Sequence, residues 1–556
     1  MRTRTIATRV ALAAVVAALG AGCGRVGDPN GPPANAVTIT VSANSAAGPW
    51  LSEAALRFGK ASIKTKAGRP VWPVISVVEA GQSIGDWQAA GGTPASALWV
   101  PDSEVWVELA NGRKIAAFKD DCVSLATSPL VIGMWRPLAE ALGYPARTLG
   151  WLDMSSLAAD SSAWAYYSGG QFGKTMRLAH THPGLSGSGA STLLAIAQAA
   201  KQQNQAVSPA DIKTAILQAS VTAFEGGVAL FAPATDGLGA TMRERGIEYL
   251  GAAVMYESTV ATYGSRDKED DIVPIYPFEG SFVATHPGCV NNAVSAEAQE
   301  AARLFRDWLL KDEGQKLAAA AGLRPVNKAV KIGEPLASAP GIDLSQPKIL
   351  FAAPIAASLD AVQELWKSAR KPVNLTMILD TSGSMAGTKI DGMRVAAETF
   401  LQQMNNEDYL TLITFSTGIS VRIQNKKVKD ARADAVSVVR GLKADGNTAL
   451  YDAIAEGAAQ IKRSTSPFRT NVMIVLTDGQ DTSSKSYKYD ANLVKLASAN
   501  STSLYTVAYG KDADNNILGG LARQSNGNFY QGTEANIAAI YQDLSTAFGG
   551  SGGIGR

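Results

Sequence analysis

Two carboxylates and three hydroxyls in the C-terminal third of the sequence stand where they could bind a cation. In "MILDTSGSM" Asp380 ends an apolar run, and Ser382 and Ser384 follow at alternate positions. Thr448 lies at a turn in "ADGNTALYDAI", and Asp478 ends a second apolar run in "VMIVLTDGQD". All five are hard oxygen donors, which suit Mg²⁺, with Mn²⁺ or Ca²⁺ as alternatives. A role as ordinary turn residues is the competing interpretation.

The elements around these residues must bring them together. The pattern predicts strands over 373–379, 410–415, 419–423, 471–477 and 502–508, and helices near 389–404, 430–442, 448–463, 491–499 and 535–547. Strands that alternate with helices form a mostly parallel sheet covered on both faces. Ligands bind beyond the carboxyl ends of such strands, so the three loops are expected to converge there.

Charge counting suggests what the cation would do. The two aspartates would neutralise a divalent cation, whereas the hydroxyls add no charge. Octahedral magnesium usually keeps some water ligands, and an incoming carboxylate could replace one of them. The predicted site is therefore a docking point for an acidic side chain.

The pattern resembles the von Willebrand factor type A (VWA) domain over residues 371–548. The motif of that family is Asp-x-Ser-x-Ser with a distant Thr and a distant Asp, and Asp380, Ser382, Ser384, Thr448 and Asp478 match it. The resemblance implies direct metal contact from the hydroxyls and contact often through water from the aspartates. It also implies a protein partner whose Asp or Glu completes the metal shell. "GNT" stands where "GGT" is common, which changes a loop residue and no ligand.

Residues 36–330 show a different α/β pattern. The order of "ITVSANSAAGPW", "ALWVPDS", "SPLVIGMWRPLAEALGYP", "HPGLSGSGAST" and "FRDWLLKDEGQKLAAAAGLRPV" resembles bacterial extracellular solute-binding proteins. That family has two α/β lobes joined by a hinge, with a small solute held between them. Ser45, Ser128 and Ser188 lie on loops that resemble its ligand-binding loops, although helix capping would also explain them.

The N-terminus has the layout of an export signal, with Arg2, Arg4 and Arg9 before an apolar run over 10–19. It resembles a lipoprotein signal peptide (1–22) with Cys23 as the lipidated residue; simple secretion is the alternative. We expect an extracytoplasmic protein held at the cell membrane by its lipid alone. Residues 23–35 are a predicted tether, 331–370 a linker with a connecting helix, and 549–556 a flexible tail.

Cys122 and Cys289 remain once Cys23 is assigned to the lipid. Two thiols in an oxidising compartment most often pair, so a disulfide that closes a long loop is expected. Two separate buried thiols are the alternative.

Composition narrows the function. The 51 basic and 49 acidic side chains give no net field for nucleic acid. With three histidines and no Ser-His-Asp order, paired catalytic carboxylates or reactive cysteine, catalysis is not expected. The leading hypothesis is metal-dependent binding of a protein partner, and the alternative is the solute receptor of an ABC-type transporter. A metal-chelatase or motor-associated subunit is a third hypothesis, which an export signal disfavours.

Overall fold

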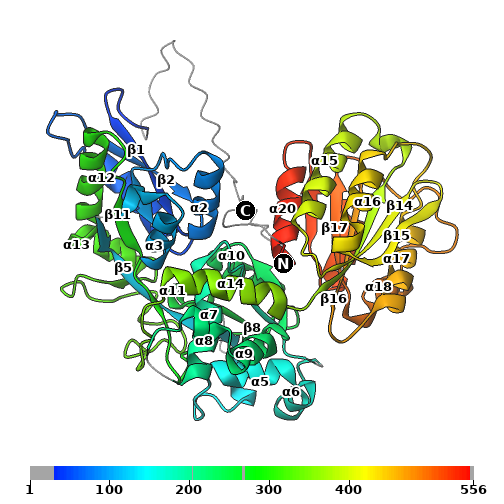
Figure 1. The fold of residues 1–556 in the computed structure, drawn as a ribbon, viewed down its shortest axis with the longest axis horizontal. Helices are drawn as coiled ribbons and strands as arrows, with labels where there is room; N and C mark the ends of the chain where they lie inside the picture. Colours follow the sequence, from blue (N-terminus) through cyan, green and yellow to red (C-terminus); the bar gives the residue numbers. More distant parts are fainter. Residues whose placement is uncertain (1–30, 120, 174, 203–204, 266–269, 551–556) are drawn as a thin grey trace, which may run out of the picture.

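The computed structural model describes residues 31–119, 121–173, 175–202, 205–265 and 270–550 (Figure 1). The predicted signal peptide, Cys23, the first part of the predicted tether and residues 551–556 of the predicted tail lie outside the described residues. In the part of the chain that is described, no helix has both the length and the apolar character needed to cross a membrane.

The first lobe is built on a sheet with the order β2-β1-β3-β11-β4, in which β1, β2 and β3 are parallel. Ser295 caps a helix of this lobe and accepts a hydrogen bond from the amide of Ala298, and the buried face of that helix includes Phe305 and Trp308. The elements are β1 (Val37–Ala43), α1 (Gly48–Lys60), β2 (Val71–Val77), α2 (Ala80–Ala89), β3 (Leu98–Val100), α3 (Val105–Gly112), η1 (Ala116–Phe118), β4 (Cys122–Ser124), β11 (Pro287–Val290), α12 (Ala296–Leu309) and α13 (Asp312–Ala320).

The second lobe has a sheet with the order β10-β5-β8-β6-β7, and β9 and β12 also pair with β5. Its strands are β5 (Ala126–Trp135), β6 (Leu178–Thr181), β7 (Val228–Ala232), β8 (Ala252–Tyr256), β9 (Ile272–Ile275), β10 (Val283–Ala284) and β12 (Arg324–Pro325). Its helices are α4 (Arg136–Ala141), α5 (Trp151–Ala159), α6 (Ser161–Ser168), α7 (Gly187–Lys201), α8 (Pro209–Ile212), α9 (Ala215–Glu225), α10 (Thr235–Arg245) and α11 (Glu257–Tyr263).

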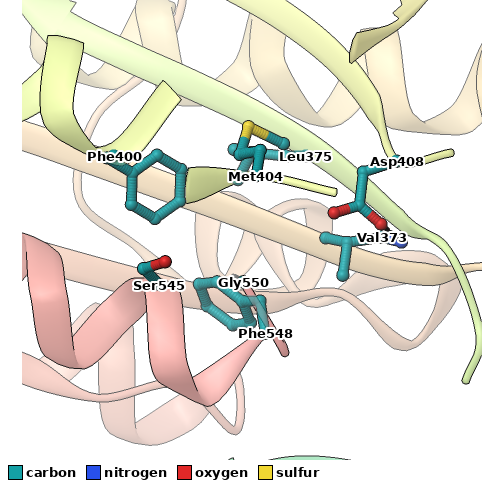
Figure 2. Close-up of a pocket in the computed structure, with 8 residues that line it drawn as sticks. All are labelled: Val373, Leu375, Phe400, Met404, Asp408, Ser545, Phe548 and Gly550. Carbon is teal, nitrogen blue, oxygen red and sulfur yellow. Dashed lines mark hydrogen bonds between the residues drawn. The ribbon is translucent and has the colours of Figure 1, made fainter. Parts of the chain in front are cut away.

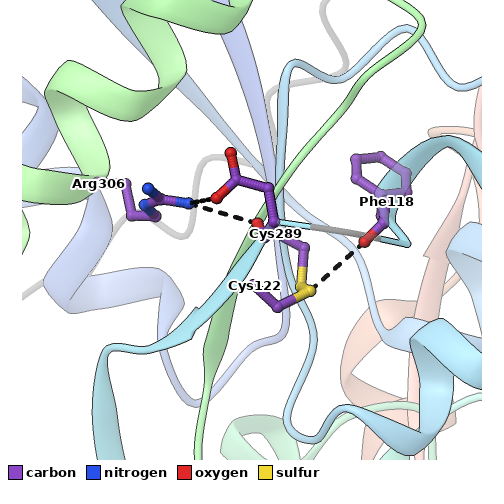
Figure 3. Close-up of a disulfide and its surroundings, with 5 residues drawn as sticks. Phe118, Cys122, Cys289 and Arg306 are labelled. Atoms are coloured by element: carbon purple, nitrogen blue, oxygen red, sulfur yellow. Dashed lines mark hydrogen bonds and ion pairs between the residues drawn. A yellow bond between two sulfur atoms is a disulfide. The ribbon is translucent and has the colours of Figure 1, made fainter.

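A disulfide lies where the chain passes between the lobes, before β5 and after β10 (Figure 3). Cys122 in β4 and Cys289 in β11 are direct partners in the antiparallel pair, and their sulfurs are bonded. Asp121, the residue before Cys122 in the chain, pairs with Arg306 of α12. The bond therefore fastens together the two strands that lead into and out of the second lobe.

The predicted connecting helix is part of the N-terminal core. This helix, α14 (Ala356–Ala369), packs on α7, α8 and α9 of the second lobe and also on α3 of the first. Arg113, at the end of α3, forms a 2.7 Å ion pair with Asp360 of α14. Trp366 is buried against the rings of His182 and Phe231. The helix thus contacts both lobes before the chain enters the last domain.

The C-terminal domain has a sheet with the order β15-β14-β13-β16-β17-β18. All these strands are parallel except β15, which is antiparallel to β14. Its elements are β13 (Val373–Asp380), η2 (Gly383–Met385), α15 (Thr388–Gln403), β14 (Tyr409–Phe415), β15 (Ile419–Lys427), α16 (Val428–Arg440), α17 (Leu450–Ser464), β16 (Thr470–Thr477), α18 (Ala491–Ala497), η3 (Ala499–Ser501), β17 (Ser503–Tyr509), α19 (Asn515–Gln524), β18 (Phe529–Gly532) and α20 (Ile537–Ala547).

Two apolar clusters cover the two faces of this sheet. Side chains of α15, α16 and α20 pack on one face, and those of α17, α18 and α19 pack on the other. This is the doubly wound, mostly parallel arrangement that the sequence predicted. Edge strand β18 was not predicted, because its four residues, "FYQG", are too short and too exposed to give an apolar run.

The base of the C-terminal domain faces the N-terminal domain. A small pocket at the amino end of β13 is lined by Val373, Leu375, Phe400, Met404, Asp408, Ser545, Phe548 and Gly550 (Figure 2). Nearby, the Nε2–H of His182 in the second lobe donates to the carbonyl of Gly550 at 2.8 Å. Because Asp380 ends the same strand, the predicted cation site lies at the opposite end of the sheet from this junction.

Candidate metal centre

Two adjacent strands deliver the two aspartates. β13 and β16 are parallel neighbours with Leu379 opposite Leu476, so Asp380 and Asp478 stand at the same edge of the sheet. Every residue of β13 is buried, as expected for a central parallel strand covered on both faces. Both aspartates are fully buried as well, so the sheet itself fixes their positions.

Hydrogen bonds join the first two loops of the site. The hydroxyls of Ser382 and Ser384 are 3.1 Å apart, and the Ser384 hydroxyl donates to Oδ1 of Asp478 at 2.7 Å. Asp380 turns back on its own loop: its Oδ1 accepts the amide of Ser382 at 2.7 Å, and its Oδ2 accepts the hydroxyl of Thr477 at 2.5 Å. Ser384 is exposed, so the site opens to solvent on this side.

Thr448 joins the site from a third loop. A Cβ placed on Gly479 would lie 3.6 Å from the Thr448 hydroxyl and 3.7 Å from the Ser384 hydroxyl, so both hydroxyls border the same point. Backbone hydrogen bonds fix this loop to the others, from Gly383 to the carbonyl of Gly446 and from Thr482 to the carbonyl of Thr448. The three predicted loops therefore meet at one place.

The electrostatic environment of the two carboxylates differs. Burial raises the pKa of Asp380, and the nearby charge of Asp478 acts in the same direction, while hydrogen bonds from Thr477 and Ser382 oppose it. Asp478 instead has a cation of its own, because Lys389 Nζ in the first turn of α15 donates to its Oδ2 at 2.6 Å. A lysine therefore sits against one of the predicted metal ligands.

The donor set fits a hard divalent cation. Two carboxylates and three hydroxyls supply only oxygen, which is the chemistry that Mg²⁺ prefers. Within the described residues there is no group of three or more His, Cys, Asp or Glu side chains that could hold a metal ion. A cation here would therefore depend on the hydroxyls of Ser382, Ser384 and Thr448 as well as on the two carboxylates.

The three serines predicted at the solute site lie at different places. The amide of Ser45, after β1, donates to Glu79 at 3.0 Å. Ser188 belongs to a buried hydroxyl cluster with Thr181, Ser186 and Thr235 in the second lobe. Ser186 brings this cluster near Glu79, because its side chain lies close enough to lower the pKa of Glu79.

Ser128 lies apart from this chain of contacts. Its hydroxyl is fully buried, donates to the Ser258 hydroxyl and accepts the Ser258 amide. These bonds join β5 to the start of α11, so the Ser128 hydroxyl has its hydrogen-bond partners within the second lobe.

Sequence reasoning missed Lys389, Glu79 and Asp102. Glu79 follows β2 and Asp102 follows β3, which is the strand-end position that had singled out Asp380. Applied to "VISVVEAG" and "ALWVPDS", the same rule would have found both acids. Lys389 carried no such pattern, because its contact depends on how α15 packs against the end of β16.

Comparison with known proteins identifies both parts of the chain. Residues 39–324 match the family model described as bacterial extracellular solute-binding protein, and residues 374–543 match the von Willebrand factor type A domain. The first match covers more than half of the chain. The protein therefore belongs to the bacterial extracellular solute-binding protein family, and a VWA domain follows its solute-binding domain.

Individual relatives match one part or the other. Inter-alpha-trypsin inhibitor heavy chain H3 of Mesocricetus auratus is 31% identical over 192 residues, which are 31% of this chain and 21% of that one. The chain thus spans about a fifth of the length of that relative. A von Willebrand factor type A structure from Catenulispora acidiphila (21% identity, TM-score 0.30) covers 32% of this chain and 43% of its own. The periplasmic binding protein P5PA (15%, TM-score 0.44) covers 60% and 99%.

Proposed function

We propose that this protein binds a protein partner through a divalent cation held by its VWA domain, without catalysis. Mg²⁺ is the expected ion, with Mn²⁺ or Ca²⁺ as alternatives, held by Ser382, Ser384, Thr448, Asp380 and Asp478. The observation that carries the proposal is the meeting of three loops, which places these oxygen donors at one edge of the sheet.

Charge and exposure support a docking role. Two carboxylates balance one divalent cation and the hydroxyls add no further negative charge, so an incoming carboxylate could replace a water ligand of the ion. The exposed Ser384 leaves the site open to solvent, and the junction with the N-terminal domain lies at the other end of β13. A partner that offers an Asp or Glu could therefore reach the ion without disturbing that junction.

The protein's expected location fits this role. The solute-binding family is extracellular by its description, and we propose that Cys23 carries a lipid that holds the mature chain at the cell membrane. The VWA domain would then display its cation site to partners outside the cytoplasm, whereas the chelatase or motor-associated hypothesis needs a cytoplasmic protein.

The test measures ion binding and partner capture separately. The mature chain without its lipidated cysteine (24–556) is titrated with MgCl₂ by calorimetry and then used as bait on solubilised cell envelopes, with magnesium or with chelator. We expect binding heat and a magnesium-dependent captured protein, both lost in Asp380→Ala and in Ser384→Ala. Asp391→Ala is the matched control, because Asp391 is an exposed aspartate of α15 that pairs with Arg394. Capture that persists with chelator and in both site variants would refute the proposal.

The second candidate function is a solute receptor for a membrane transporter. It is favoured by the family of residues 39–324 and by the polar groups that meet between the lobes, where the amide of Gly81 in the first lobe donates to the carbonyl of Leu185 in the second and Ser186 lowers the pKa of Glu79. A small molecule that raises the melting temperature of the mature chain would support it.

A further inference from the structure

We propose that the site between the two lobes takes a small organic cation, such as a protonated amine, and that Glu79 and Asp102 recognise its charge. This inference rests on the second function proposed above, solute binding by the N-terminal domain. It is independent of the metal site in the VWA domain.

The site forms where strand ends from both lobes face each other. Glu79 follows β2 and Asp102 follows β3 in the first lobe, and the start of α7 follows β6 in the second. We call this boundary between the strand ends of the two lobes the seam. Across it, the amide of Gly81 in the first lobe donates to the carbonyl of Leu185 in the second at 2.8 Å. Carboxyl ends of parallel strands are where α/β folds bind ligands, and here two such edges meet.

Carboxylates dominate this seam. Glu79 and Asp102 are 8% and 2% exposed, and Asp236 at the start of α10 adds a third negative charge close to Glu79. Burial has the largest effect on the pKa of each of these three acids, and the groups that also act are hydroxyls, backbone amides, the Trp106 indole and other carboxyls, with no cation among them. Burial raises the pKa of Asp102 to about 7, which reflects the lack of a compensating positive charge.

Polar atoms at the seam also lack partners. Tyr256 of the second lobe donates to Oδ2 of Asp102 at 2.5 Å, but Oδ1 of Asp102 accepts no hydrogen bond from the residues that the structure describes. His286 is fully buried, and its Nε2 likewise has no partner among them. Burial lowers the pKa of His286 to about 4, so the ring is neutral and does not offset the acids. A buried carboxylate oxygen without a partner is costly unless a ligand satisfies it.

An anion is disfavoured because the protein's own acid already holds the place it would use. The N-terminus of a helix attracts negative charge, and α7 is the long helix that opens onto the seam. The Asp102 carboxylate packs against Gly187 at that terminus so closely that a Cβ on Gly187 would collide with it. A sulfate or phosphate would therefore meet a carboxylate where it needs free amides.

A bare metal ion is disfavoured by the spacing of the acids. Glu79, Asp102 and Asp236 are not among any group of three described carboxylate, histidine or cysteine side chains that could hold a metal. A protonated amine has several N–H donors and its charge spread over a larger body, so it can satisfy separated acceptors. The ring of Tyr256 beside Asp102 would also suit a cation with apolar groups.

The experiment compares classes of solute on one protein. The mature chain carrying Asp380→Ala, which removes the metal site, is melted at pH 8 with putrescine, spermidine, choline or arginine. Parallel samples contain sulfate, phosphate, glucose, maltose, MgCl₂ alone or ZnCl₂ alone. We expect at least one amine at about 100 times its Kd to raise the melting temperature by roughly 5 °C, and the other compounds to have no effect.

Charge-removing variants then test the residues. Glu79→Gln and Asp102→Asn should each weaken the amine at least tenfold by calorimetry, whereas Glu53→Gln should not, since Glu53 is an exposed acid of α1 that pairs with Arg57. Circular dichroism checks that each variant is folded. Stabilisation by an anion, sugar or bare metal, or unchanged amine binding in both variants, overturns the cation assignment but keeps solute binding. No stabilisation by any compound overturns both.

Discussion

The VWA site and the seam between the lobes are built in the same way but differ in their charges. Both gather acids at the carboxyl ends of parallel strands, and in both an aspartate is buried completely or nearly so. They differ in how the negative charge of the buried aspartate is compensated. In the VWA domain Lys389 and the Ser384 hydroxyl donate to Asp478, whereas the seam leaves Asp102 with a hydrogen bond from Tyr256 and an unpartnered oxygen.

The two sites also differ in the contacts that hold their side chains in place. The VWA loops are joined to one another by backbone hydrogen bonds within a single domain, so the fold of that domain by itself positions the oxygen donors. The seam is organised only while two lobes are in contact, and its acids gain most from a ligand that brings positive charge. A site held within one domain and a site formed between two lobes should respond differently to the same perturbation.

The largest effect is expected from removing the disulfide. Cys122→Ser with Cys289→Ser opens a loop of 167 residues and should lower the free energy of unfolding by about 2–5 kcal/mol, because the unfolded chain is no longer constrained. Urea denaturation measures the loss. The heat of magnesium binding should not change, since the VWA loops do not depend on β4 and β11. An unchanged unfolding free energy, or a lost magnesium heat, would contradict this contrast.

The next effect concerns the uncompensated acid of the seam. The pKa of Asp102 is raised from its ordinary value of 3.8 to about 7, so the folded protein binds a proton that the unfolded chain has released between these values. Stability therefore falls as the pH rises from about 4 to 7, and the full penalty persists above pH 7.

Asp102→Asn removes this penalty. At pH 8 the variant should be more stable than the parent by on the order of 2–4 kcal/mol, and the gap should vanish towards pH 4. Urea denaturation at pH 4.5, 6 and 8 measures it, and Glu53→Gln serves as the pH control. A gap that does not depend on pH would show that Asp102 is not an uncompensated acid.

The smallest effect is expected at the VWA site, where Lys389 contacts Asp478. Lys389→Met removes the ammonium that contacts Asp478, so magnesium no longer competes with a fixed positive charge and its affinity should rise about tenfold, or ~1.4 kcal/mol. Lys389→Arg keeps the charge and is the matched control. Calorimetry gives both affinities, and an affinity that falls in the methionine variant would mean that Lys389 supports the ion.

Much of the VWA domain could be predicted because its information is local. Apolar runs that end in Asp380 and Asp478 mark neighbouring strand ends, and the Asp-x-Ser-x-Ser spacing places its hydroxyls on the same loop. Strand β18 was missed since a short, half-exposed edge strand has little apolar pattern. Helix α14 was predicted as a helix, but its packing on both lobes depends on long-range contacts that periodicity does not encode.

The sequence by itself determined the two fold types, their order and the set of oxygen donors at the VWA site, because these follow from hydrophobic periodicity and from residues close together in the chain. Only the tertiary structure decided that Lys389 reaches Asp478, that the expected disulfide joins the paired strands β4 and β11, and that Glu79 and Asp102 face α7 across a seam. These are contacts between segments far apart in the chain, and they form only when packed sheets and helices bring buried charges close enough to affect one another.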